Sequence, residues 1–220
     1  MQLKVLLDMS QQNNDPKEDL MAIRNMMERS SKFLSLSGLS GIVAGICALV
    51  GAAVAYFLIL DTGQVQYDQY LRSLGDASTS SVRLLLTIDA LVVLIIASLG
   101  AFYFSMLKSK KANQPLWTNA TRRLLGHLLI PLVTGGLFVI ILMTMNNIQL
   151  VASVTLIFYG LSLVNAGKFT FGEIHYLGLT EIVLGILAGI FVNHGLLFWV
   201  LGFGFMHIVY GIVMYFRYDR

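Results

Sequence analysis

Residues 82–107 read VRLLLTIDALVVLIIASLGAFYFSML, and this stretch decides the fold class. A helix of about 20 residues crosses the hydrocarbon core of a bilayer, whereas apolar runs of about 10 to 14 residues are typical of buried helices in soluble proteins. The stretch exceeds the longer of these lengths, and its only charged residues are Arg83 and Asp89. It is therefore predicted to be a transmembrane helix.

Five further apolar runs lie on either side of this stretch. The six predicted spans are 34–60, 82–107, 124–145, 148–167, 174–193 and 195–216. Glu181 interrupts the fifth run, but enough Leu, Ile and Val remain for that run to cross the bilayer. We therefore expect an all-α membrane protein with a six-helix transmembrane domain at 34–216.

The composition agrees with this assignment. Of the 220 residues, 56% are hydrophobic and only 12% are charged, and the mean hydropathy is +0.74. A soluble globular protein carries about twice that share of charged residues. The single cysteine, Cys47, lies inside an apolar run, so neither a disulfide framework nor a thiolate metal site can form. No phosphate loop, zinc spacing or nucleic-acid module is present, and we expect no cofactor and no nucleic-acid partner.

Two connections are short enough to fix how neighbouring helices run. The sequences at 145–148 and 192–195 leave room only for tight turns. Helices joined by such turns lie antiparallel. The third and fourth helices, and the fifth and sixth, are therefore predicted to form hairpins.

The distribution of basic residues predicts the orientation in the membrane. With these spans, all of the 15 Lys and Arg residues except Arg72 and Arg83 fall on one side. Basic loops stay in the cytoplasm. We therefore expect both termini in the cytoplasm, including a short cytoplasmic tail at 217–220.

The segment before the first span has a helix-start signal. Residues 1–14 are polar and are expected to be flexible, whereas Asp15, Pro16 and Glu18 form a capping pattern. Apolar residues then recur at helical spacing, which predicts a cytoplasmic amphipathic helix at 15–33. Such a helix docks either on the membrane surface or on a protein partner.

Small residues form stripes on two of the predicted spans. They are Gly38, Gly41, Gly45, Ala48 and Ala52 in the first span, and Gly185 and Gly189 in the fifth. Small residues let membrane helices approach closely. The stripes are interpreted as packing surfaces inside the bundle, with a contact to a protein partner or to a second copy as the alternative.

Ionisable residues inside the spans are the candidates for function, because they are costly in hydrocarbon. Glu181 and His207 are predicted to lie at similar depth on adjacent antiparallel helices. Polar residues of the fourth helix at a similar depth complete a candidate polar pocket, which consists of Glu181, His207, His127, Asn165 and Tyr159. Asp89 is a separate candidate in the outer half of the second helix.

Several uses of this pocket remain open. A Glu181–His207 contact can lock the helices together, because buried polar groups are normally satisfied by each other. The same pair can also carry protons or a solute across the membrane. A haem bound between His127 and His207 is a third interpretation, which rests on two histidines alone.

An enzyme is a fourth interpretation. Gly38-Leu39-Ser40-Gly41 resembles the serine motif of rhomboid proteases, and His207 followed by Gly211 resembles their helix 6 histidine. This resemblance implies an intramembrane serine protease using Ser40 and His207. The chain departs from that family because Ser40 lies on the first helix, whereas the rhomboid serine begins the fourth.

A broader resemblance covers most of the chain. Three segments are similar to an uncharacterised family of bacterial six-helix membrane proteins: IRNMMERSSKFLSLSGLSGIVAG (23–45), PLWTNATRRLLGHLLIPLVTGG (115–136) and YGLSLVNAGKFTFGEIHYLGLTEIVLGILAG (159–189). That family has no established activity, so the resemblance implies the architecture and no site.

These observations favour a multi-pass inner-membrane protein that is not an enzyme and acts as a scaffold, sensor or accessory subunit. Its expected partners are the lipid bilayer and a protein. The alternative is a small carrier or proton-coupled transporter that uses Glu181 and His207, and the remote alternative is the protease.

Overall fold

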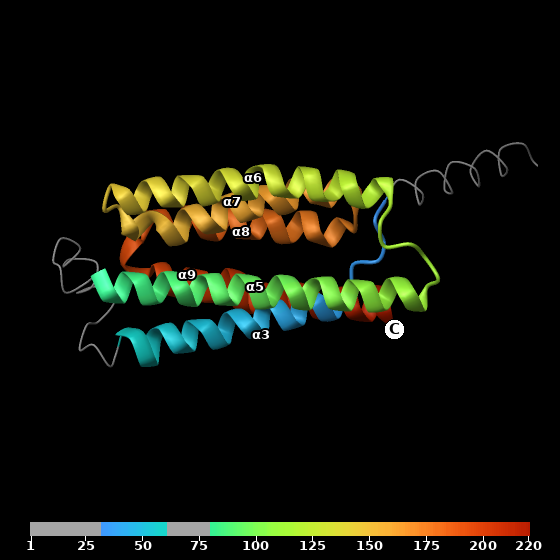
Figure 1. The fold of residues 1–220 in the computed structure, drawn as a ribbon, viewed down its shortest axis with the longest axis horizontal. Helices are drawn as coiled ribbons and strands as arrows, with labels where there is room; N and C mark the ends of the chain where they lie inside the picture. Colours follow the sequence, from blue (N-terminus) through green and yellow to red (C-terminus); the bar gives the residue numbers. More distant parts are fainter. Residues whose placement is uncertain (1–31, 61–79) are drawn as a thin grey trace, which may run out of the picture.

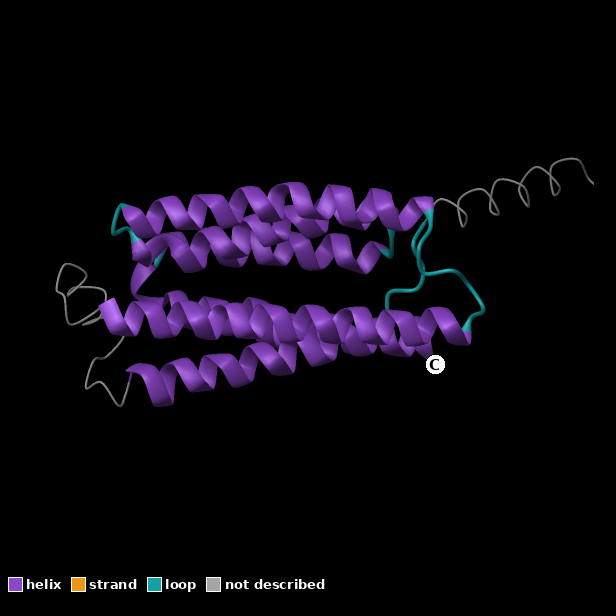
Figure 2. Cartoon of the chain, in the orientation of Figure 1, coloured by secondary structure: helices purple, strands orange, loops and turns teal. Residues whose placement is uncertain are grey.

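The computed structural model describes residues 32–60 and 80–220, and their secondary structure is helical (Figure 2). Within these two ranges, six helices are long and apolar enough to cross a membrane: Gly38–Leu60, Val82–Lys111, Asn119–Thr144, Ile148–Phe169, Gly172–Ile190 and Val192–Asp219. Each overlaps one predicted span, which confirms the all-α, multi-pass architecture. The predicted flexible segment at 1–14, and all but the end of the predicted amphipathic helix at 15–33, lie outside the described residues.

The described residues form thirteen helical elements. In chain order they are α3 (Gly38–Val54), η1 (Ala55–Leu60), α5 (Ser80–Lys111), α6 (Asn119–Thr144), η3 (Ile148–Leu150), α7 (Val151–Ala166), η4 (Gly167–Phe169), α8 (Gly172–Ile190), η5 (Val192–His194), α9 (Gly195–Trp199), η6 (Val200–Met206), α10 (His207–Met214) and η7 (Tyr215–Asp219). Elements η1, η6 and η7 are π-helical, and η3, η4 and η5 are 3₁₀ turns. The elements from η5 to η7 together form the sixth span.

Several helix ends differ from the prediction by a few residues; the second span, for example, ends at Lys111 rather than 107, and the third begins at Asn119 rather than 124. The first span begins at Gly38 because Ser37 is its N-cap, with the Ser37 hydroxyl oxygen accepting a hydrogen bond from the Leu39 amide. The residues set apart as a tail at 217–220 continue the sixth helix as far as Asp219. The last turn of that helix therefore belongs to the folded bundle.

The six spans form two groups of three (Figure 1). In one group α7 packs between α6 and α8, and in the other α3 packs between α5 and the sixth span. The predicted hairpin of the third and fourth helices is present as α6 and α7. The fifth and sixth helices are joined by a tight turn as predicted, but the sixth packs chiefly against α3 rather than α8.

Glycines explain why these pairs approach so closely. A Cβ atom added to Gly211 would lie 2.6 Å from the Ile42 amide nitrogen and 2.8 Å from the Gly38 carbonyl oxygen. In the other group, a Cβ on Gly160 would lie 2.6 Å from the Gly178 carbonyl oxygen. Such distances leave no room for a side chain, so the α3–α10 and α7–α8 backbones are in direct contact.

The predicted small-residue stripes lie in these two contacts. A Cβ on Gly45 would lie 2.6 Å from the Gly204 carbonyl oxygen, and one on Gly185 would lie 2.8 Å from the Ile157 amide nitrogen. Both stripes are therefore covered by helices of the same chain. This corrects the alternative that they contact a protein partner or a second copy, because a covered face cannot dock another molecule.

We name the two ends of the bundle by one residue each. The Lys108 end holds the starts of α3, α6 and α8 together with the end of the sixth span, and the Arg83 end holds the start of α5 and the turn after α6 (Figure 1).

Candidate functional site

Three polar side chains from three helices meet between α7, α8 and the sixth span. The Tyr159 hydroxyl oxygen lies 2.7 Å from Nε2 of His207, and Nδ1 of His207 lies 3.3 Å from Oε1 of Glu181. Tyr159 comes from α7, Glu181 from α8 and His207 from the first position of α10. We call these three residues the polar triad.

The polar triad lies at the middle of the bundle. Glu181 is the central residue of the 19-residue helix α8, and Tyr159 and His207 lie near the midpoints of their own spans. Because each helix of this length crosses the hydrocarbon core, the triad lies close to the bilayer midplane. The predicted depth match of Glu181 and His207 is thus present.

Gly202 makes the space that the carboxyl group occupies. A Cβ on Gly202 would overlap Oε2 of Glu181 and would lie 2.6 Å from Cδ2 of Leu156. Gly202 lies in η6, the π-helical stretch that comes directly before His207. π-helical turns inside α-helices are rare and occur frequently at functional sites.

The hydrogen bonds of His207 fix where its ring proton lies. Nδ1 is 3.0 Å from the carbonyl oxygen of Gly202, and a carbonyl oxygen only accepts. Nδ1 therefore carries a hydrogen, and in the neutral ring Nε2 accepts from the Tyr159 hydroxyl. The rings of Tyr159 and His207 also pack against Phe203, with centroid distances of 5.1 and 6.0 Å. Both ring nitrogens are thus in use.

Glu181 is the least satisfied member of the triad. Its side chain has no exposed surface, and neither carboxyl oxygen has a hydrogen-bond partner among the described residues. The 3.3 Å contact from Oε1 to Nδ1 is an ion-pair distance, but the Nδ1 hydrogen is directed to Gly202. Most buried polar atoms in proteins are hydrogen-bonded, so this carboxyl group stands out.

The other predicted site residues do not join the triad. Asn165 lies six residues beyond Tyr159 on α7 and is partly exposed, and six residues of α-helix turn a side chain to a different face. His127 is exposed on α6, where its ring stacks on Phe169 with a centroid distance of 4.7 Å. Asp89 is partly exposed on α5, next to Gly51.

The residues of the protease interpretation are not in contact. The Ser40 hydroxyl donates to the Ser37 carbonyl oxygen, whereas the nitrogens of His207 contact Tyr159 and Gly202. A serine nucleophile requires its base within hydrogen-bond reach. His127 and His207 are likewise engaged with different neighbours, Phe169 and Tyr159.

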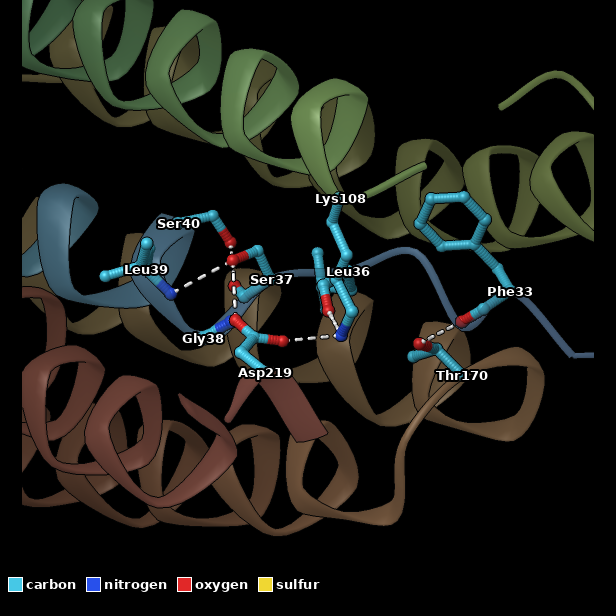
Figure 3. Close-up of polar contacts among 9 residues, drawn as sticks. All are labelled: Phe33, Leu36, Ser37, Gly38, Leu39, Ser40, Lys108, Thr170 and Asp219. Carbon is cyan, nitrogen blue, oxygen red and sulfur yellow. Dashed lines mark hydrogen bonds and ion pairs between the residues drawn. The ribbon is translucent and has the colours of Figure 1, made fainter. Parts of the chain in front are cut away.

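A second polar cluster, at the Lys108 end, was not anticipated from the sequence (Figure 3). Oδ2 of Asp219 accepts hydrogen bonds from the Ser37 hydroxyl and from the Gly38 amide, each at 2.7 Å. Oδ1 of Asp219 forms an ion pair with Lys108 Nζ at 2.6 Å. We call Asp219, Lys108, Ser37 and Gly38 the clasp, because it joins the sixth span, α5 and the start of α3.

The clasp is reinforced by neighbouring contacts. Lys108 also donates to the Leu36 carbonyl oxygen at 2.8 Å, and Thr170 donates to the Phe33 carbonyl oxygen at 2.7 Å (Figure 3). From the sequence, Lys108 is interpreted only as one of the basic residues that set the orientation in the membrane. The one local signal is Ser37, whose position before an apolar run is typical of an N-cap.

No site for a metal ion is formed by the described residues. Within 32–60 and 80–220, no group of three or more His, Cys, Asp or Glu side chains gathers closely enough to hold one.

Comparison with known proteins identifies no family, because no family model, curated protein or solved structure matches the chain. The resemblance to a six-helix family implies an architecture of six long apolar helices, and the described residues contain six such helices.

Proposed function

We propose that this chain is a non-catalytic scaffold, sensor or accessory subunit of the bacterial inner membrane. One observation carries the proposal: the ionisable residues at the bilayer midplane are buried between helices, with Glu181 at 0% and His207 at 6% exposure. A carrier site must be reached by its solute, and a catalytic site must be reached by its substrate. Glu181 and His207, which are buried in this way beside the half-buried Tyr159, instead fasten α7, α8 and the sixth span together.

The orientation proposed for this protein rests on its charges. Lys108, Lys110 and Lys111 lie in the last turn of α5 at the Lys108 end, and Arg122 and Arg123 lie in the first two turns of α6 at the same end. Basic residues collect on the cytoplasmic side. The Lys108 end therefore faces the cytoplasm in this proposal. A reporter inserted near Asn113 should report cytoplasm, and an external signal there would reverse the orientation.

The second candidate is a proton-coupled carrier, and a specific observation favours it. Within 32–60 and 80–220, no hydrogen-bond partner reaches either of the two buried Glu181 oxygens, an arrangement that structural fastening alone does not require. In such a carrier, Glu181 would exchange a proton when the helices separate. Intramembrane carboxylates of this kind occur in proton relays.

Proton flux in vesicles separates the two candidates. The purified protein is reconstituted, a pH gradient is applied, and internal pH is followed for wild type, Glu181→Gln and the control Glu173→Gln. Glu173 is the matched control because it binds Arg217 and Tyr218 near the Lys108 end, away from the triad. We expect no flux above empty vesicles in any sample. Flux that is abolished by Glu181→Gln but kept in Glu173→Gln would replace the scaffold by the carrier.

A further inference from the structure

Helices α5 and α6 leave a cleft between them at the Arg83 end. Arg83, Leu84 and Thr87 of α5 line one wall, and Ile140, Met143 and Thr144 of α6 line the other. Its volume of about 670 Å³ lies in the range of small-molecule sites. The cleft is open rather than enclosed.

The helices that border this cleft are the least packed of the six. In α5 and α6 only 6% of the most apolar stretch is buried, compared with 22% to 44% in the other four spans. Leu84 and Ile140, one on each wall, are 61% and 57% exposed. An apolar cleft with this exposure at the side of a membrane protein is open to the lipid.

The mouth of the cleft carries a cation with spare hydrogen-bond donors. Nη1 of Arg83 donates to Oδ1 of Asn146 at 3.0 Å, which satisfies one donor without neutralising the charge. No carboxylate of the described residues pairs with Arg83. A guanidinium group has five N–H donors in a planar fork that fits the oxygens of a phosphate.

The hydroxyl groups of Thr87 and Thr144, which line the cleft near Arg83, can only accept further hydrogen bonds. The Thr87 hydroxyl donates to the Arg83 carbonyl oxygen, and the Thr144 hydroxyl donates to the Ile141 carbonyl oxygen, each at 2.8 Å. Their free lone pairs suit a ligand that also brings donors. Arg83 lies in the first turns of its helix and Asn146 in the turn after α6, so both are at headgroup level.

We propose that this cleft binds one phospholipid, with its phosphate on Arg83 and an acyl chain between α5 and α6 along Leu84, Ile140 and Met143. The charge complements an anionic phosphodiester, and the apolar walls below complement the chain. Hydroxyl or ammonium groups of the headgroup donate to Thr87 and Thr144. The bound lipid fills the space that the two groups of helices leave open.

Native mass spectrometry of the full-length protein tests this site, with phosphatidylglycerol as the probe and diacylglycerol as the phosphate-free comparison. We expect one tightly bound phosphatidylglycerol and weaker diacylglycerol binding. Arg83→Gln should weaken phosphatidylglycerol binding roughly tenfold, because it removes a charge-assisted contact. Met143→Trp should weaken it as well, by filling the cleft while keeping the cation.

Arg122→Gln is the control for the loss of a cation away from the cleft. Arg122 lies at the opposite end of α6, so phosphatidylglycerol binding should be unchanged in this variant. Wild-type binding by Arg83→Gln, or equal affinity for diacylglycerol, would overturn the phosphate site. If the wild-type protein is instead a dimer without bound lipid, and if Arg83→Gln and Met143→Trp both dissociate it, a second copy of the chain occupies the cleft and the lipid site is overturned.

Discussion

Asp219 and Glu181 are both carboxylates with little or no exposed surface, but their oxygens are satisfied to different degrees. The Asp219 side chain is 8% exposed, and its Oδ2 accepts hydrogen bonds from Ser37 and Gly38. Its Oδ1, like the Glu181 oxygens, has no hydrogen bond among the described residues, but it lies 2.6 Å from Nζ of Lys108 in an ion pair. Glu181 is 0% exposed, and its one polar contact in the described part of the chain is the 3.3 Å approach to His207. The clasp near the water is thus better satisfied than the triad in the hydrocarbon.

This difference separates two uses of a buried carboxylate. A carboxylate whose oxygens all have close, charge-assisted partners stabilises the fold through its own contacts. A carboxylate without hydrogen bonds adds little to the stability of the fold. Its influence on stability becomes visible when a neighbouring residue is removed and the carboxylate is left buried alone. The mutations below test this distinction in order of expected effect.

The largest effect is expected for His207→Ala. This change leaves the Tyr159 hydroxyl, the Gly202 carbonyl and the Glu181 carboxyl group without their shared partner. Each buried polar group that is left unpaired costs about 1–3 kcal/mol, so the loss should be roughly 3–5 kcal/mol in total. Thermal unfolding in detergent, followed by loss of helical circular dichroism, should show a large drop in the midpoint.

A double-mutant cycle then tests whether the pair is coupled. Glu181→Gln alone should cost at most about 1 kcal/mol, because the oxygens already lack hydrogen bonds. With His207→Ala in place, Glu181→Gln should recover part of the loss, giving a coupling of about 0.5–3 kcal/mol. Strict additivity of the two changes would mean that the residues do not interact.

Asp219→Ala should have the next largest effect, about 2 kcal/mol. It removes the ion pair with Lys108 and the charge-assisted hydrogen bonds at the start of α3. The stability of Asp219→Asn should lie between those of Asp219→Ala and wild type, because asparagine keeps a hydrogen-bond acceptor but loses the charge. Trypsin cleavage after Arg217 reports the same opening, and unchanged cleavage in Asp219→Ala would mean that the clasp does not hold the helix end.

Tyr159→Phe should cost roughly 1–2 kcal/mol. The phenylalanine ring keeps the packing against Phe203 but leaves Nε2 of His207 without its 2.7 Å hydrogen bond. Chemical denaturation in mixed micelles measures the loss. A more stable variant would show that the tyrosine hydroxyl is not bonded to His207 in the folded protein.

Arg217→Ala is expected to change stability least, by no more than about 0.5 kcal/mol. Arg217 is 66% exposed, so its ion pair with Glu173 is weakened by water and salt. Tyr218 continues to donate to Glu173. A loss larger than that of Asp219→Ala would reverse the order proposed for these contacts.

The sequence predicts the parts of this structure that depend on distance along a helix. Apolar runs are long enough to mark each span, and a constant rise per residue is sufficient to place Glu181 and His207 at one depth. Rotation about the axis is less well defined by the sequence. Asn165 was expected in the pocket on depth alone, but it lies on a different face of α7 from Tyr159.

Contacts between distant segments could not be predicted in the same way. The small residues of α3 indicate close packing but do not identify the partner, which is the sixth span. Asp219 binds Ser37 across a separation of 182 residues, and no local pattern encodes that contact. The π-helical stretch η6, which orients His207, also has no clear signal in hydropathy.

The pairing of α3 with the sixth span has a consequence for biosynthesis. The glycines of α7 and α8 belong to successive spans, so their contact can form as soon as that hairpin has been inserted. The glycine face of α3 has no such neighbour, because its partner is synthesised only after the four intervening spans. Contacts between distant segments form late and leave intermediates exposed. Between insertion of the first span and insertion of the sixth, the glycine face of α3 is therefore not covered by its partner. During this interval the face is accessible to an insertion factor or a membrane protease.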